Sequence, residues 1–247
     1  MRCEIHYISL MKIVGIIPAR GGSRSIPQKN IRMLGNKPLV AWTIEEALKS
    51  GLDRVVVSTD DPTIKEIAEK YGAEVPFLRP ANLAGDTTAI EPVLLHAFRW
   101  LKENNDYTAD GIAFLPPTSP VREAAHINEA IKIFENKKPD SVVSVFEAAA
   151  NDNPHWMLRR GESGEITLFT GEPLEKIKDR RQELPTCYKR NDIIYILKPD
   201  NLYRGKPTLY GNKVELYIMD EYFDVDINTE YDWLLCEFKL RQGGRLS

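Results

Sequence analysis

A cationic, glycine-containing loop that follows an apolar run is the first stretch that could do chemistry. Residues 13–17 are apolar and rich in β-branched side chains, which is typical of a buried parallel strand. Pro18 ends the run, and Gly21 and Gly22 follow, where backbone amides can converge on an anion. The cations of the loop are Arg20, Arg24 and Lys29. We expect this loop to bind a polyphosphate, and the alternative is a solvated surface turn.

The loop matches neither of the two common phosphate-binding sequence patterns. It lacks both Gly-x-x-x-x-Gly-Lys-Ser/Thr and Gly-x-Gly-x-x-Gly. The sequence therefore does not favour a Walker-type ATPase or a simple dinucleotide-binding enzyme.

An acidic pair near the other end of the chain could hold a metal ion. Asp224 and Asp226 alternate with Val225, so an extended backbone places both carboxylates on one face. Mg²⁺ commonly takes one or two carboxylates and completes its octahedron with phosphate oxygens and water. The alternative is an exposed acidic strand edge, with Asn228 capping the last helix.

Alternating apolar strands and helices must position these two stretches. Strands are expected over residues 13–17, 54–58, 74–77, 111–115, 140–145, 165–169, 192–197 and 213–218. Helices are expected over residues 38–49, 62–71, 90–103, 123–135 and 231–240, with a helical turn over 199–205. Thr59, Asp60 or Asp61 either caps the second helix or faces a ligand at the strand end. The alternation predicts a Rossmann-like, three-layer α/β fold with a mostly parallel sheet.

The alternation breaks between residues 148 and 190. Prolines and glycines separate short hairpin-like segments there, and so long a loop without structure would be unusual in a compact domain. We expect a small inserted region that serves as a dimerisation arm. The predicted division is an N-terminal extension (1–11), an α/β domain (12–147 and 191–247) and the inserted region (148–190).

The segment from Ile17 to Asn30, IPARGGSRSIPQKN, resembles the signature loop of the acylneuraminate cytidylyltransferases. These enzymes make CMP-sialic acid and its bacterial nine-carbon relatives. Their loop holds the triphosphate of CTP, which implies the same role here. The residues that the resemblance assigns to CTP are Ala19, Arg20, Gly21, Gly22, Ser23, Arg24, Lys29 and Asn30.

Two further segments match the same family in the same order. Residues 79–88 resemble a stretch that lines the nucleotide, which implies that Arg79 and Thr88 contact CTP. Asp86 belongs to that site or only caps the next helix. Residues 115–122 resemble a strand-end segment, which implies Thr118 and Ser119 as substrate-binding residues. Many sialic acid enzymes have a sugar-contacting glutamine where this chain has Pro116, so the choice of sugar stays open.

The segments 180–185 and 188–191 resemble stretches whose basic groups reach the triphosphate or the sugar. The resemblance implies Arg181 and Lys189 as substrate-binding residues, and the alternative is a solvated charge run. Lys189 stands where many members have arginine, and Asp192 where they have glycine.

In this family the Asp-x-Asp sequence binds the metal, which implies Mg²⁺ on Asp224 and Asp226. The implied catalytic residues are Arg20, Lys29, Asp224 and Asp226. The resemblance also implies the nucleotidyltransferase fold. It further implies a reaction in which the anomeric hydroxyl of an acidic nine-carbon sugar attacks the α-phosphorus of CTP. The products are a CMP-sugar and pyrophosphate. Alternatives are a relative that activates the eight-carbon sugar Kdo or uses another nucleotide, and a catalytically silent nucleotide-binding protein.

Composition narrows the class further. The chain has 247 residues, 43% of them hydrophobic and 28% charged, which is ordinary for a globular protein and excludes a disordered one. A net charge of −3 gives no sign of nucleic acid or anionic membrane as a partner. No apolar run approaches the roughly 18 residues of a membrane span, and charged residues interrupt the first ten positions, so we expect a cytoplasmic protein. The three cysteines lie far apart in the sequence, so we expect free thiols rather than disulfides.

Overall fold

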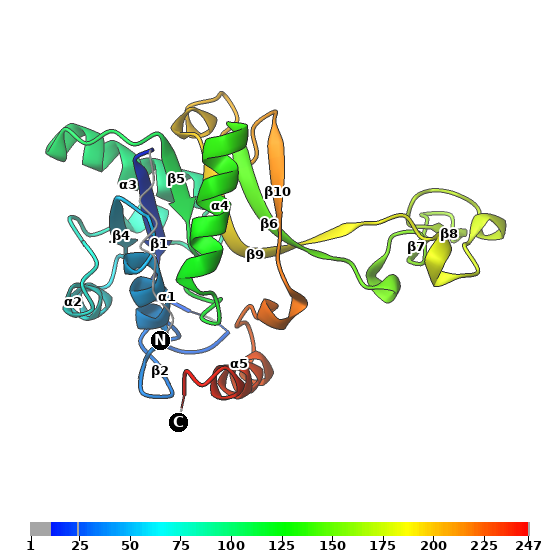
Figure 1. Ribbon diagram of the computed structural model, residues 1–247, viewed down its shortest axis with the longest axis horizontal. Coiled ribbons are helices and arrows are strands. Elements are labelled where there is room, and N and C mark those ends of the chain that lie inside the picture. The colour runs from blue at the N-terminus through cyan, green and yellow to red at the C-terminus, as the bar shows by residue number, and fades with distance from the viewer. Residues whose placement is uncertain (1–10, 24, 247) are drawn as a thin grey trace.

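A six-stranded sheet forms the centre of the protein, in the order β10-β6-β9-β5-β1-β4 (Figure 1). The structure is a computed structural model that describes residues 11–23 and 25–246. The strands of the sheet are β1 (Ile13–Pro18), β4 (Arg54–Ser58), β5 (Gly111–Phe114), β6 (Ser141–Glu147), β9 (Tyr188–Leu197) and β10 (Val214–Ile218). Strand β1 pairs in parallel with β4 and β5, and β10 pairs in parallel with β6. Only β9 runs antiparallel to its neighbours β5 and β6, so the predicted mostly parallel sheet is confirmed.

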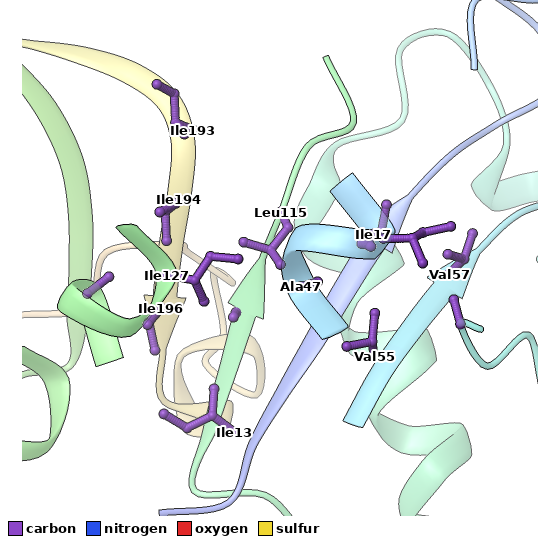
Figure 2. Packing of buried hydrophobic residues seen from close by; sticks show 14 of the residues in the cluster. Ile13, Ile17, Ala47, Val55, Val57, Leu115, Ile127, Ile193, Ile194 and Ile196 are labelled. Atoms are coloured by element: carbon purple, nitrogen blue, oxygen red, sulfur yellow. The ribbon is translucent and has the colours of Figure 1, made fainter. Parts of the chain in front are cut away.

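Helices cover both faces of this sheet and complete the three layers. The helices are α1 (Leu39–Leu48), α2 (Pro62–Lys70), α3 (Ile90–Asn105), α4 (Ala124–Lys137) and α5 (Glu230–Gln242). Alternate residues of β1 point to opposite faces: Ile13 and Ile17 pack with α1, α2 and α4, whereas Val14 and Ile16 pack with α3. Figure 2 shows part of the first of these two cores, with Ala47 of α1 and Ile127 of α4 beside the strands.

Helix α5 lies apart from the sheet and packs on a third apolar cluster near the carboxyl end of the chain. Trp233, Cys236 and Leu240 of α5 are buried there against Trp42 of α1. The loop between α1 and the cationic stretch contributes the short strands β2 (Met33–Leu34) and β3 (Lys37–Pro38). This cluster therefore joins the two parts of the sequence that contain the cationic loop and the acidic pair.

The helix caps decide between several alternatives. Asp61 caps α2, because its carboxylate accepts hydrogen bonds from the backbone of Thr63 at 2.7 Å and of Ile64 at 3.4 Å. Of the two alternatives for Asp86, the helix cap is not found: the cap of α3 is Ala89, without a side-chain hydrogen bond.

Asn228, which the alternative interpretation of the acidic pair made the cap of α5, does not cap it. Thr229 is the cap, and its hydroxyl accepts from the backbone N–H of Asp232 at 3.2 Å. The carboxylate of Asp232 accepts from the backbone N–H of Thr229 at 2.7 Å, which completes a capping box. A reciprocal pair satisfies two backbone donors, whereas a lone asparagine cap satisfies one.

Two predicted strands differ from the structure. Residues 74–77 do not form a strand: a single bridge links Glu74 to Val56, and Pro76 offers no N–H to continue the ladder. Strand β9 begins at Tyr188, earlier than the expected residue 192, because its first residues pair with Val145, Phe146 and Glu147 of β6. The other predicted strands and the predicted helices lie within a few residues of their expected bounds, whereas β2, β3 and β7 were not predicted.

Residues between β6 and β9 form an arm that projects to one side of the sheet, away from α1 to α4 (Figure 1). The arm contains the antiparallel pair β7 (Leu158–Arg160) and β8 (Ile166–Leu168). Its short 3₁₀ helices are η2 (Ala150–Asp152), η3 (Leu174–Lys176) and η4 (Arg181–Glu183). Strand β9 carries the chain from the arm into the sheet without a break at residue 191. The proposed domain limits therefore stay a prediction.

Three more 3₁₀ helices complete the described chain: η1 (Ala81–Leu83), η5 (Pro199–Leu202) and η6 (Glu221–Phe223). In the part of the chain that the structure describes, no helix is both long and apolar enough to cross a membrane. Cys187 and Cys236 have free thiols, while Cys3 lies outside the described residues.

Candidate active site

A cavity of about 430 Å³ lies at the carboxyl ends of β1 and β5. This is the edge where open parallel sheets place their ligands. The predicted site residues that line it are Arg20, Ser23, Lys29, Asn30, Arg79, Thr88 and Thr118. These residues come from three segments far apart in sequence, and the fold brings them to one cavity.

Further lining residues had no role in the sequence-based prediction. They include Pro18, Ser25, Leu83, Gly85, Phe114 and Pro117. Most of them are apolar or small, so their side chains gave no chemical signal. The signal that could have found Phe114 and Pro117 was their place at the end of a predicted parallel strand. Asp86 and Pro116, which the sequence analysis had considered for the nucleotide and the sugar, also line the cavity, as does Asn228.

The cationic loop begins with a tight approach between Gly21 and the end of β4. A Cβ atom on Gly21 would lie 2.6 Å from a carboxylate oxygen of Asp61, so only glycine fits there. The backbone N–H of Gly21 donates to the Asp60 carboxylate at 3.2 Å. Gly22 has no atom within 4 Å of such a Cβ among the described residues. The Gly21 amide is therefore engaged by a carboxylate in this structure.

Ala19 and Asn30 hold the two ends of this loop. Ala19 is fully buried and its N–H donates to the carbonyl of Ser58 at 2.9 Å, so it fastens the loop to β4. The side-chain amide of Asn30 donates to the carbonyl of Arg20 at 2.9 Å. The buried Oδ1 of Asn30 has no hydrogen-bond partner within residues 11–23 and 25–246. An acceptor of this kind suits a ligand hydroxyl or amino group.

Lys29 links the loop to the segment of the acidic pair. Its side chain is 9% exposed, and Nζ donates to the carbonyl of Ile227 at 2.7 Å. Burial lowers the pKa of Lys29 from its ordinary value, although the nearby Asp226 carboxylate acts in the opposite direction. The Lys29 ammonium therefore lies between the expected phosphate site and the expected metal site.

Two arginines supply further positive charge to the cavity. Arg79 is 6% exposed, and its guanidinium donates to the hydroxyl of Ser58 at 3.1 Å and to the carbonyl of the same residue. Burial lowers the pKa of Arg79 to about 10, so the group is still protonated at neutral pH. Arg20 forms an ion pair with Asp86 at 2.5 Å, and both side chains are 30% exposed. Arg24 lies outside the described residues.

A buried arginine supports the segment that lines the cavity at Pro116 and Thr118. Arg122 is 1% exposed and donates to the carbonyls of Ile193 at 2.7 Å and Pro116 at 3.2 Å. The Thr118 carbonyl accepts from the backbone N–H of Ile227 at 2.9 Å. Ser119 is fully buried and does not line the cavity, so its predicted substrate contact is not seen in this arrangement.

The acidic pair lies between η6 and α5. Asp224 accepts from Lys189 Nζ at 3.1 Å, and Asp226 accepts from the Asn228 side chain at 2.6 Å. Val225 between them is 3% exposed and packs inward. No cluster of three or more metal-binding side chains occurs in the described residues. Neither Asp224 nor Asp226 lines the cavity, but Asn228, which donates to Asp226, does. Two carboxylates fit Mg²⁺, which takes its other ligands from phosphate and water.

The two basic residues predicted on the arm have different surroundings. Lys189 lies at the base of the arm, and its hydrogen bond to Asp224 raises the pKa of its ammonium group. Arg181 lies in η4 on the exposed arm, which Figure 1 shows projecting away from the sheet. The structure thus brings Lys189 to the acidic pair but does not bring Arg181 to the cavity of its own chain.

The chain belongs to the cytidylyltransferase family, whose sequence model matches residues 14–234. The prediction of a nucleotidyltransferase enzyme of this family is confirmed.

Three relatives indicate the branch of the family. The chain is 35% identical over 230 residues to CMP-N,N'-diacetyllegionaminic acid synthase of Legionella pneumophila, covering 92% of this chain and 95% of that one. It is 36% identical over 189 residues to pseudaminic acid cytidylyltransferase of Campylobacter jejuni, covering 75% and 78%. It is 36% identical over 226 residues to N-acylneuraminate cytidylyltransferase of Escherichia coli, covering 91% of this chain and 51% of that longer one. The resemblance seen in the sequence is thereby confirmed.

Solved structures confirm the fold. CMP:2-keto-3-deoxy-manno-octonic acid synthetase complexed with CTP matches with a TM-score of 0.66 and 18% identity, covering 95% of this chain and 100% of that one. The 4-diphosphocytidyl-2C-methyl-D-erythritol synthase of Anaerococcus prevotii matches with a TM-score of 0.64 and 14% identity, covering 94% and 99%.

Proposed function

We propose that this protein transfers CMP from CTP to an acidic nine-carbon sugar of the nonulosonic class and releases pyrophosphate. The observation that best supports the proposal is the convergence of Arg20, Lys29 and Arg79 on one cavity at the carboxyl edge of the sheet. Three cations in one partly buried site suit a triphosphate. The relatives' names supply the sugar class, since they specify legionaminic, pseudaminic and acylneuraminic acids.

In the proposed reaction the chain positions two substrates and neutralises charge. The anomeric hydroxyl of the sugar attacks the α-phosphorus and gives its proton to water. The bond from the α-phosphorus to the bridging oxygen breaks, and pyrophosphate leaves. Arg20, Ser23 and Lys29 bind the β- and γ-phosphates, so they stabilise the charge that collects on the leaving group. Arg79 and Asn30 hold the rest of the nucleotide. We further propose the cytoplasm as the site of the reaction, because CTP is available there.

We propose Asp224 and Asp226 as the carboxylates that hold Mg²⁺. A bound Mg²⁺ would neutralise phosphate charge and make the attacking hydroxyl more acidic. Asp224 also pairs with Lys189 at 3.1 Å. We expect EDTA to stop turnover and excess Mg²⁺ to restore it, and Asp226→Asn to abolish turnover while the protein stays folded by circular dichroism. A normal rate for Asp226→Asn would remove the pair from the mechanism.

We propose that two copies of the chain associate through their arms. The arm exposes several large apolar side chains: Leu158, Ile166, Phe169, Leu174 and Ile177. A second copy would cover them, and Arg181 could then reach a cavity that it does not reach in its own chain.

Light scattering tests this association. We expect a dimer for the wild type and a monomer for the double variant Leu158→Glu, Phe169→Glu. Phe238→Glu is a matched control, because Phe238 is 58% exposed on α5 rather than on the arm. A dimer that survives the double variant would contradict the proposal.

The reaction is tested with purified full-length protein, Mg²⁺ and each of the four nucleoside triphosphates. Each is offered with N-acetylneuraminic, legionaminic or pseudaminic acid or with Kdo, while pyrophosphate release is measured. We expect release with CTP and one or more of the nine-carbon acids. Release with Kdo alone would favour the eight-carbon alternative, and no release with any pair would favour a silent nucleotide-binding protein.

A further inference from the structure

A polar cluster lies at the point where β9 enters the sheet. Asp192 accepts hydrogen bonds from the hydroxyl of Tyr195 and, at 3.3 Å, from a guanidinium nitrogen of Arg190. The Nε atom of Arg190 lies 3.1 Å from Oδ1 of Asp192, the same oxygen that accepts from Tyr195. Arg190 also donates to the hydroxyl of Tyr210 at 2.7 Å. One carboxylate thus fixes both an arginine and a tyrosine.

The cluster meets the cavity through two stacked rings. Tyr195 is fully buried, and its ring stacks on Phe114 with a centroid separation of 5.6 Å and an interplanar angle of 28°. The two residues are direct partners in the ladder between β9 and β5. Phe114 in turn lines the cavity. A shift of the Tyr195 ring would therefore move a wall of the cavity.

The backbone of Asp192 is in a conformation that glycine adopts far more readily. Its φ angle is +52°, in the left-handed region that costs energy for a residue with a Cβ. Strained residues persist where the surrounding contacts hold them, and they gather at functional sites. Asp192 keeps this backbone while its carboxylate makes contacts that a glycine could not make.

The wall next to Tyr195 differs in chemistry from the rest of the cavity. Arg20, Lys29 and Arg79 give the other side positive charge for the triphosphate nucleotide. Phe114, Pro116 and Pro117 are uncharged and lie at the end of β5, beside β9. Because the cationic side accommodates CTP, the uncharged wall faces the second substrate, which is the acceptor sugar.

We propose that Asp192 is a positioning residue for the acceptor sugar: it fixes Tyr195 and thereby sets the Phe114 wall against which the sugar binds. This inference rests on the proposed function. The Tyr195 hydroxyl remains a donor at all ordinary pH values, because burial and the Asp192 carboxylate both raise its pKa. The arrangement is therefore a permanent support rather than a pH switch.

Asp192→Gly is the informative variant, because it relieves the backbone and removes the carboxylate together. If the carboxylate has no role, the variant should be equally or more stable and should have normal kinetics, because only the backbone is relieved. The positioning role predicts that KM for the sugar rises about tenfold while KM for CTP stays within about twofold of the wild type. Asp192→Asn should have a smaller effect, since its amide oxygen can still accept from Tyr195.

Two more variants separate the hydroxyl contact from the backbone. Tyr195→Phe keeps the ring but removes the donor, and we expect it to raise KM for the sugar in the same way. Asp106→Gly is the matched control: Asp106 also has a left-handed backbone, with φ of +48°, but it caps the far end of α3. We expect that control to leave both KM values unchanged.

The outcomes distinguish this inference from the function on which it rests. A wild type that releases no pyrophosphate with any sugar contradicts the proposed function. An active wild type with a normal sugar KM in Asp192→Gly overturns the positioning role alone. Equal rises in both KM values would also overturn it, because they would show a general disturbance of the cavity. Melting temperatures confirm that each variant is folded.

Discussion

Lys29 Nζ donates a hydrogen bond of 2.7 Å to the backbone carbonyl of Ile227, 198 residues further along the chain. This bond joins the loop after the first strand to the segment that contains the acidic pair. It places a buried ammonium group between two sites of opposite charge, and the Asp226 carboxylate partly offsets the loss of solvation. The two ends of the sequence thus form one site through this residue.

Replacing Lys29 tests its catalytic role. We expect Lys29→Met to lower kcat/KM for CTP by about 100-fold, because a cation beside the leaving phosphates is lost. The free energy of unfolding should change by less than about 2 kcal/mol, since burying the ammonium group costs energy that the hydrogen bond offsets. Steady-state kinetics and urea unfolding measure both. Lys12→Met, at an exposed lysine, is the control, and normal turnover in Lys29→Met would refute the role.

The ion pair between Arg20 and Asp86 is expected to compete with CTP. In Asp86→Asn the carboxylate no longer attracts the guanidinium, so we expect KM for CTP to fall by about twofold to fivefold. Both side chains are partly exposed, so stability should change by less than about 1 kcal/mol. Kinetics at low and high salt measure the effect, which should shrink at high salt. A higher KM would instead show that Asp86 contacts the nucleotide favourably.

Arg122 is expected to be structural. Its guanidinium donates to the carbonyls of Ile193 and Pro116 and to the hydroxyl of Thr43, and burial lowers its pKa to about 9. Arg122→Met should lower the free energy of unfolding by about 3 kcal/mol, because buried acceptors lose their donors.

Urea unfolding at neutral pH measures this loss. The control Lys65→Met removes a surface ion pair of 3.8 Å and should cost less than about 1 kcal/mol. Equal effects of the two substitutions would argue against a structural role for the buried guanidinium.

Asp140 gives a prediction for acidic pH. Its carboxylate accepts from the backbone N–H groups of Asn212 and Lys213, which lowers its pKa from 3.8 to about 2. Because the folded pKa is the lower one, the stabilisation is complete above about pH 4 and is lost as the pH falls toward 2. We expect Asp140→Asn to cost about 1 kcal/mol at pH 7 and less at pH 3, measured by urea unfolding. A constant difference would contradict the pKa shift.

Much of the fold follows from local sequence. The apolar runs and helical periodicity predicted the parallel strands and the helices within a few residues, because burial on both faces imposes such patterns. Local sequence was not enough where a strand needs a distant partner or where two residues compete to cap the same helix. Residues 74–77 resemble a strand but form only one bridge. The sequence left the cap of α5 open, and Thr229 caps it because Asp232 completes a capping box.

By itself, the sequence determined the chemistry that lies in contiguous motifs: the cationic loop with Lys29, and the pair Asp224 and Asp226. Spacing along the chain is enough to define such motifs. Only the tertiary structure decided that Lys29 reaches Ile227, that Arg20 pairs with Asp86, and that β9 enters antiparallel and stacks Tyr195 on Phe114. Those contacts join residues far apart in sequence, and their partners are chosen by the packing of the whole sheet rather than by local propensity.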